Sequence, residues 1–343
     1  MTEADRITGT LLGTALGDAL GLATEGMSAR AIARRFGRVE RFHLIGRTGF
    51  VSDDTEQAAL VAQCLARHPQ DVDLCVQAFR RSLLGWFCRL PWGVGRATIR
   101  ACVRIGFGLT PSGVMSAGNG AAMRAAIVGI FFNDRPVQRE QFGRALAEVT
   151  HRDPRAVEGA LYVAELAAAC AGSPPETPPH TCQEQARRCV TNSALGEAID
   201  RARELALRGA STREAAESCG TSGFVVHTVS FATFGFLRYG SDPLLALTEI
   251  INAGGDTDST GAILGGWLGA LHGEKAFPRE LTDRIHDGPF GPTHLRDLAG
   301  CLAQVQNGGP ATVPSYSPAL AMARNLALFP VVIGHGFRRL LPF

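Results

Sequence analysis

Two clusters of carboxylates and hydroxyls have the residue types and spacing to do chemistry in this chain. The segment AGGDTDSTG places the first cluster at residues 256–259, directly before the apolar run AILGGWLGAL. The segment GFVSDDTEQAAL places the second at residues 52–55, at the start of an amphipathic run. Helix capping could explain both, because Asp, Ser and Thr accept hydrogen bonds from the free amides of a helix's first turn. Asp53 with Glu56 would then form a capping box.

Metal binding is the alternative to capping, because two adjacent carboxylates at Asp53 and Asp54 are more than a cap needs. Like charges this close raise each other's pKa and oppose folding unless a cation lies between them. Asp18 and Glu25 lie seven residues apart, which is two turns and one side of a helix. If the clusters and Glu25 converge, their oxygens suit Mg²⁺ or Mn²⁺ better than zinc. Five carboxylates and two hydroxyls predict two ions about 4 Å apart.

A third motif, SAGNGAAMRAA, is a small-residue loop that runs into a predicted helix. Its residues Gly118, Asn119 and Gly120 could present backbone amides to phosphate or pyrophosphate oxygens. An ordinary turn explains the same residues, since Gly and Asn are common in turns. Taken alone, the loop is better interpreted as a turn, and phosphate binding depends on the acidic clusters beside it.

The elements that must position these motifs are predicted to be helices, because apolar residues recur at spacings of three and four along most of the chain. Two stretches also carry glycine at every fourth residue, which places the glycines on one helix face and allows close backbone packing. A membrane pair is excluded by Asp18 and by apolar stretches shorter than the roughly 20 residues of a span. The glycines are Gly9, Gly13, Gly17 and Gly21, and Gly261, Gly265, Gly269 and Gly273.

Composition excludes several other classes of protein. The 343 residues are 45% hydrophobic and 19% charged, as in a globular chain. The basic residues are scattered arginines with Lys275 as the single lysine, so nucleic-acid binding is not indicated. The nine cysteines have no CxxC pair, and the first residues are polar and unlike a signal peptide. We therefore expect free thiols, a cytoplasmic location and a monomer.

Two proline-rich stretches, at residues 173–181 and 307–318, are predicted to be surface loops. The second separates residues 319–343, which are apolar and basic enough for a membrane or partner surface. A terminal segment docked on the same domain is the favoured interpretation. The predicted organisation is a domain over residues 1–290 and a C-terminal extension of unknown role over residues 291–343.

The motifs together resemble those of the ADP-ribosylglycohydrolase family. GTLLGTALGDALGLATEG, GFVSDDTEQA, SAGNGAAMRAA, the TH of EVTHRDP and NAGGDTDSTGAILGGWLGALHG occur in the family's order over residues 5–290. The resemblance implies a compact all-α fold, a multi-helix orthogonal bundle with two Mg²⁺ or Mn²⁺ ions in a central cleft. It also implies hydrolysis of the bond between the anomeric carbon of the distal ribose of ADP-ribose and a modified protein or small acceptor.

The positions of the motifs indicate which residues of this chain correspond to the functional residues of the family. The implied metal ligands are Ser52, Asp53, Asp54, Asp256, Asp258 and Ser259. The candidate catalytic residues are Glu25, which falls where the family has an acidic residue close to the metals, and Asp53, Asp54 and Asp256. The implied ADP-ribose site comprises Ser116, Gly118, Asn119, Gly120, His151 and Phe224.

The chain also departs from the family pattern. Ser52 and Ser259 stand where Thr is usual, Asp153 where many relatives have a second His, and Phe224 where a Tyr occurs. Ser116 stands where arginine-directed members have an Asp that could assist a guanidinium leaving group. The neutral loop favours O-linked or free ADP-ribosyl substrates over ADP-ribosyl-arginine.

Two other functions remain open at this point. The chain could be an inactive protein that binds ADP-ribose or a nucleotide, although a descendant of that kind would typically have lost an acidic ligand. It could also be a two-metal hydrolase of another nucleotide-like substrate, such as a phosphate ester. The second function would require a cationic clamp, and Arg124 is the one arginine close to the glycine-rich loop in sequence.

Overall fold

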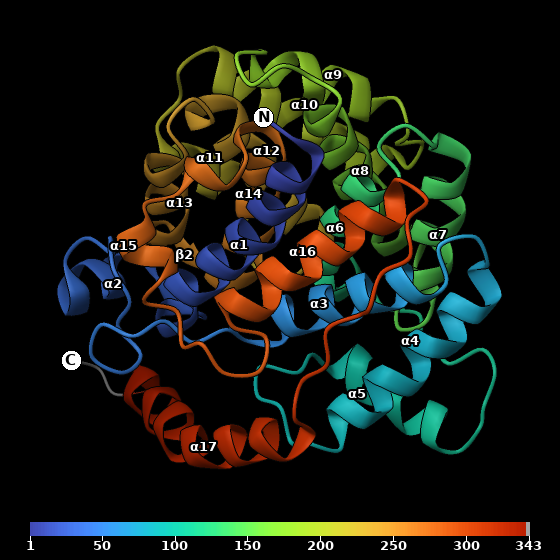
Figure 1. Cartoon of the computed structure of the whole chain (residues 1–343). Helices are drawn as coiled ribbons and strands as arrows, with labels where there is room; N and C mark the ends of the chain where they lie inside the picture. The colour runs from blue at the N-terminus through green and yellow to red at the C-terminus, as the bar shows by residue number, and fades with distance from the viewer. Residues whose placement is uncertain (341–343) are drawn as a thin grey trace.

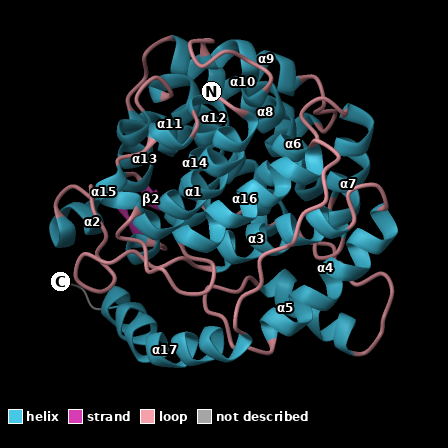
Figure 2. Cartoon of the chain, in the orientation of Figure 1, coloured by secondary structure: helices cyan, strands magenta, loops and turns pink. Residues whose placement is uncertain are grey.

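The computed structural model describes residues 1–340, with side chains as far as residue 336. These residues form seventeen α-helices, three 3₁₀ turns and two two-residue strands (Figures 1 and 2), so the predicted all-α fold is confirmed. In chain order the elements are α1 (Glu3–Gly21), η1 (Leu22–Thr24), β1 (Met27–Ser28), α2 (Ala29–Phe36), α3 (Asp53–Arg67), α4 (Val72–Phe87), α5 (Arg96–Gly106), η2 (Asn119–Arg124), α6 (Ala126–Phe131), α7 (Pro136–Glu148), α8 (Pro154–Ala171), α9 (Pro179–Arg187), α10 (Ser193–Leu207), α11 (Thr212–Cys219), α12 (Val225–Tyr239), α13 (Pro243–Asn252), β2 (Gly254–Gly255), α14 (Thr257–His272), η3 (Glu274–Ala276), α15 (Arg279–Thr282), α16 (Pro292–Gln306) and α17 (Pro318–Leu340).

Helices α1 and α14 form the centre of the fold (Figure 1), and their glycine faces pack on each other. The close backbone packing that the spacing predicts is confirmed, and the structure identifies the partner of each face. A Cβ atom at Gly13 would lie 2.1 Å from the carbonyl oxygen of Gly265, closer than real Cβ atoms approach. Contacts near the start of α1 reach Gly269 and Gly273, and Gly21 at its end reaches Thr257, so the helices are antiparallel. The end of α1 and the beginning of α14 therefore lie together, which brings the chain around Glu25 close to the 256–259 cluster.

Glu25 does not share a helix side with Asp18, so the two-turn interpretation of their spacing was wrong. Helix α1 ends at Gly21, the turn η1 follows it, and Glu25 has non-helical backbone angles. Asp18 stays inside the core, where its Oδ2 accepts from the backbone amides of Ser52 (2.9 Å) and Thr55 (3.2 Å). Burial raises the pKa of Asp18 to about 6, although the hydrogen bonds from Ser52 and Thr55 act to lower it. Its role in the fold is to anchor the start of α3 to α1.

The start of α3 is capped by Ser52, and the predicted Asp53 and Glu56 capping box does not form. The hydroxyl of Ser52 accepts from the amide of Asp54 at 3.4 Å. Glu56 instead accepts from the indole nitrogen of Trp86 at 2.6 Å and pairs with Arg324 of α17. With Ser52 as the cap, the carboxylates at positions 53 and 54 are both free for another purpose.

The last two helices pack on the same body. Helix α16 packs on α1 and α3. Leu328 of α17 shares an apolar cluster with Leu22 of η1 and Trp92, and Asn325 donates to the carbonyl of Arg89 at 2.9 Å. The Pro318–Gly336 stretch is long and apolar enough to span a membrane by length and composition alone. The observed position of α17 is along the edge of the domain (Figure 1), next to the turn before Glu25 and the loop before α5.

Candidate active site

A cleft of about 660 Å³ contains most of the residues that the motifs singled out. Its floor includes Glu25 and Asp256, together with Asp258 from the first turn of α14. One carboxylate oxygen from each of these three residues lies within 4.8 Å of the other two. Asp256 occupies the N-cap position of α14 without making a side-chain cap hydrogen bond. Capping therefore does not account for this cluster.

The 52–55 cluster forms the adjoining part of the floor. Asp53 and Asp54 line the cleft, and Asp53 accepts from the amide nitrogen of Gln57 at 3.2 Å. Ser52 is buried beneath them and donates to Oδ2 of Asp54 at 3.1 Å, while the Ser259 hydroxyl also hydrogen-bonds Asp54. Oδ1 of Asp54 is buried without a hydrogen-bond partner among the described residues. A buried carboxylate oxygen without a partner is costly unless a ligand completes its surroundings.

The electrostatics of the floor fit a divalent cation. Burial, and then repulsion between neighbouring carboxylates, raises the pKa values of Asp53, Asp54 and Asp258 well above the usual range. The carboxylates that repel Asp53 and Asp258 include those of Glu25 and Asp256. Hard divalent ions prefer such all-oxygen ligands, and a bound cation would return these groups to the charged form. The residues present therefore fit Mg²⁺ or Mn²⁺.

Asn119 connects the glycine-rich loop to the acidic floor. Its side-chain nitrogen donates to Oδ2 of Asp256 at 2.6 Å and to the hydroxyl of Thr228 at 3.1 Å. The backbone amide of Asn119 bonds to the carbonyl of Gly223, and that of Gly118 is 3.4 Å from the Ser116 hydroxyl. Two of the amides that were candidates for phosphate binding thus already have partners. Asn119 orients Asp256 from outside the acidic cluster.

His151 lies against the same loop and is neutral. Its Nδ1 is 2.8 Å from the hydroxyl of Thr150, and that oxygen also accepts from the guanidinium of Arg124 at 2.7 Å. Because Arg124 already donates to this oxygen, we assign the Thr150 hydrogen to Nδ1 and the ring proton to Nε2, which lies beside Gly118 and Gly120. Burial, reinforced by Arg124, lowers the pKa of His151 to about 3.

Arg124 does not provide a cationic clamp in the cleft. It is 2% exposed, stacks on Phe79 at 5.0 Å, and donates to Gln57 and to the carbonyl of Gly120. Burial lowers its pKa to about 10. Arg124 therefore does not supply the cationic clamp that a phosphate-ester hydrolase would require.

Ser116 and Phe224, the two remaining candidates for substrate binding, differ in their positions. Ser116 lines the cleft with the loop glycines. Phe224 pairs with Gly118 through the backbone, its half-buried ring contacts Arg155 and His227, and it is not part of the described cleft lining. Its role in substrate binding stays a prediction.

Several lining residues were not identified from the sequence. Gly93, Arg96 and Thr98 form one side of the cleft, and residues 221–223 form another. The segment WGVGRAT carried a usable signal, since it shares with the other loop motif glycines directly before a helix. Gly93 has φ +80°, and a Cβ atom there would lie 2.8 Å from Oδ1 of Asp53. A glycine is therefore required beside that carboxylate.

Comparisons with known proteins agree on one family. The ADP-ribosylglycohydrolase family model matches residues 1–311, which include α16. The chain is 29% identical over 283 residues to the ADP-ribosyl-(dinitrogen reductase) glycohydrolase of Rhodospirillum rubrum, covering 80% of this chain and 88% of the relative. It is 30% identical over 311 residues to an uncharacterized protein of Archaeoglobus fulgidus, covering 88% and 97%. A solved structure described as an ADP-ribosylglycohydrolase-related protein complex matches with a TM-score of 0.68 and 25% identity, covering 89% of this chain and 99% of that one.

Proposed function

Because this chain belongs to the ADP-ribosylglycohydrolase family, we propose that it hydrolyses the bond between ADP-ribose and a modified protein or small acceptor, with two divalent ions at the acidic floor of the cleft. The observation that carries the proposal is the convergence of Glu25, Asp256 and Asp258 beside Asp53 and Asp54. Nothing in the fold requires five acids in one place, and their mutual repulsion opposes folding. A bound cation would offset this repulsion and orient the substrate, which would explain why the acids are clustered.

The ions would be held by the aspartates at positions 53, 54, 256 and 258, with the hydroxyls of Ser52 and Ser259 beside them. When bound, Mg²⁺ or Mn²⁺ would orient the ribose diol and lower the pKa of a water molecule. Glu25 is half-buried at the edge of the floor, where a carboxylate can accept a proton from the attacking water. Carboxylates around the anomeric carbon also stabilise the positive charge that develops as a glycosidic bond breaks.

The part of the cleft lined by the glycine-rich loop and His151 supports binding of the rest of ADP-ribose. A Cβ atom at Gly120 would lie 2.9 Å from the His151 ring, so glycine keeps this part of the loop clear. Nε2 of His151 offers a neutral donor, and Arg96 lines the cleft with a positive charge that suits the pyrophosphate. The volume of about 660 Å³ is within the range of small-molecule sites.

An inactive binding protein remains the alternative, and the complete set of acidic residues argues against it. Titrating chelator-treated protein with Mg²⁺ while measuring release of ADP-ribose would separate an enzyme from a binding protein.

The proposal also places the protein in the cytoplasm as a monomer. All nine cysteines are free, which suits a reducing compartment.

For the acceptor, we propose an O-linked substrate, such as ADP-ribosyl-serine or an ADP-ribose ester. The neutral side chain of Ser116 lines the cleft and cannot pair with a guanidinium leaving group. Matched substrates modified on serine, glutamate and arginine, incubated with Mg²⁺, test this preference. Faster release from the serine or glutamate substrate supports it, and release from the arginine substrate alone contradicts it while leaving the hydrolase proposal intact.

A further inference from the structure

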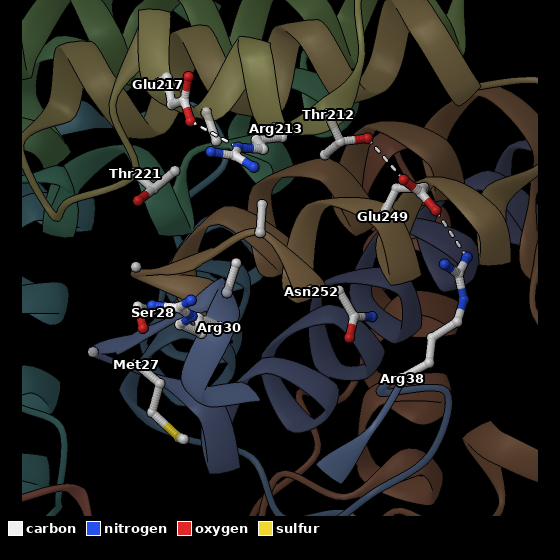
Figure 3. A pocket seen from close by; sticks show the side chains of 15 residues that line it. Met27, Ser28, Arg30, Arg38, Thr212, Arg213, Glu217, Thr221, Glu249 and Asn252 are labelled. Carbon is white, nitrogen blue, oxygen red and sulfur yellow. Dashed lines mark hydrogen bonds and ion pairs between the residues drawn. The ribbon is translucent and has the colours of Figure 1, made fainter. Parts of the chain in front are cut away.

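A second, larger pocket adjoins the cleft, and Figure 3 shows the side chains that line it. Its volume is about 980 Å³, and it is bordered by the beginning of α2, by α11 and by the end of α13. Gly26, Thr221 and Gly255 line both this pocket and the cleft, so they form the wall between the two. We call it the acceptor-side pocket, for the reasons that follow.

The shared wall is made of backbone. The amide of Gly26 donates to the carbonyl of Gly255 at 2.7 Å, and the strands β1 and β2 continue this pairing. The amide of Asp256 donates to the carbonyl of Thr221 at 2.7 Å. Gly255 has φ +90°, and a Cβ atom there would lie 2.0 Å from that carbonyl oxygen. The residues next to the wall in the chain are Glu25 and Asp256, so the pocket begins where the reaction would occur.

The charges of the pocket leave one arginine available. Figure 3 shows Arg213 paired with Glu217, and Glu249 joined to Arg38 at 2.8 Å and to Thr212. Both glutamates of the lining therefore have partners.

Arg30 is exposed and has no ion-pair partner among the described residues. It is the second residue of α2, and a cation in the first turn opposes the helix dipole. Helix stability therefore does not explain an arginine at this position.

We propose that the acceptor-side pocket binds the polypeptide segment around the ADP-ribosylated residue, and that Arg30 selects segments with an acidic side chain beside it. The inference rests on the proposed function. If the phosphates lie toward Gly118 and His151 and the distal ribose lies at the acidic floor, the acceptor projects past Gly26 and Thr221 into this pocket. The lining carries three arginines and two glutamates, so it favours a negatively charged segment.

The test compares binding of peptides that carry ADP-ribose through a linkage that water cannot cleave. One peptide has aspartates beside the modified residue and the other has lysines, and free ADP-ribose is the third ligand. The proteins are the Mg²⁺-loaded wild type, Arg30→Glu, and Arg201→Glu on the exposed side of α10 as a matched charge reversal away from the pocket. Glu is favourable in the first turn of a helix, so Arg30→Glu is expected to fold.

For Arg30→Glu we expect about tenfold weaker binding of the aspartate peptide, tighter binding of the lysine peptide and unchanged binding of ADP-ribose. Arg201→Glu should bind all three ligands like the wild type. Equal affinities of wild type and Arg30→Glu for both peptides would overturn the assignment of the pocket. A peptide-specific loss in Arg96→Glu instead would place the acceptor on the other side of the cleft. A wild type that neither binds nor releases ADP-ribose would contradict the proposed function itself.

Discussion

Gly17 of α1 lies so close to Gly261 of α14 that a Cβ atom on Gly17 would be 2.0 Å from the Gly261 carbonyl oxygen. This contact is at the end of the helix pair that carries the acidic floor. The glycine faces thus determine the separation of the helices and, through it, the position of Asp258 relative to Glu25. Close packing of these glycines is therefore needed to form the acidic floor.

Gly17→Ala should destabilise the protein by at least about 2 kcal/mol, because a methyl group cannot enter this contact without separating the helix backbones. Thermal or urea unfolding measures the effect. The control is Gly300→Ala in α16, where a Cβ atom would meet nothing within 4 Å and Ala should be neutral or slightly stabilising. Equal stability of the two variants would contradict close packing of α1 and α14.

Helix type and the close-packing glycine face of α1 and of α14 could be predicted from sequence because both depend on local periodicity, whereas the contact between the two faces is a finding of the structure. A four-residue spacing places the glycines on one face of a helix, and this placement does not depend on contacts with the rest of the chain. The separate roles of Asp18 and Glu25 could not be predicted. They depend on the end of α1 at Gly21 and on the direction of the following turn, which tertiary contacts decide.

The acidic motifs identified the floor of the cleft, but residue type did not show which polar groups face it. Arg124 is close to the loop in sequence and buried in the structure, whereas Arg96 lies elsewhere in sequence and lines the cleft. The ring of Phe224 contacts Arg155 and His227 and is not part of the described lining. Contacts between distant segments determine each of these positions, and a single sequence does not display them.

Asn119→Ala should weaken divalent-ion binding and turnover by about 10- to 100-fold, because Asp256 loses the donor that orients its carboxylate. Calorimetry with Mn²⁺ and initial rates measure the two effects. Thr228→Val removes only the partner behind Asn119, so its effect should be smaller. If Asn119→Ala bound metal like the wild type, Asn119 would have no positioning role.

His151→Gln should make the free energy of unfolding less dependent on pH between about 6.5 and 3. The folded state holds His151 neutral with a pKa lowered to about 3, while the unfolded chain takes up a proton near 6.5. Stability is therefore lost as the pH falls through this window, at up to about 1.4 kcal/mol per pH unit for one proton. Urea unfolding at several pH values tests this slope. The exposed His180→Gln should retain the wild-type slope, and an unchanged slope in His151→Gln would show that His151 is not buried as a neutral ring.

Arg324→Met should destabilise the protein by about 3–5 kcal/mol, because it leaves the Glu56 carboxylate buried without its cation. Glu56→Leu combined with Arg324→Met should recover much of the loss, since neither charge then remains buried. Urea unfolding of the single and double variants gives the comparison. A single variant as stable as the wild type would mean that α17 is not docked through this pair.

The measurement that tests the central claim most directly is release of ADP-ribose from a modified serine substrate as a function of Mg²⁺ concentration, for the wild type, Asp256→Asn and the exposed control Asp297→Asn. The account predicts no release by chelated wild-type protein and full recovery with Mg²⁺. It also predicts wild-type behaviour for Asp297→Asn, and for Asp256→Asn a folded protein that is slower by roughly a factor of 10³. Metal-independent release, or wild-type rates in Asp256→Asn, would contradict the claim that the carboxylates at the meeting point of α1 and α14 form a catalytic metal centre.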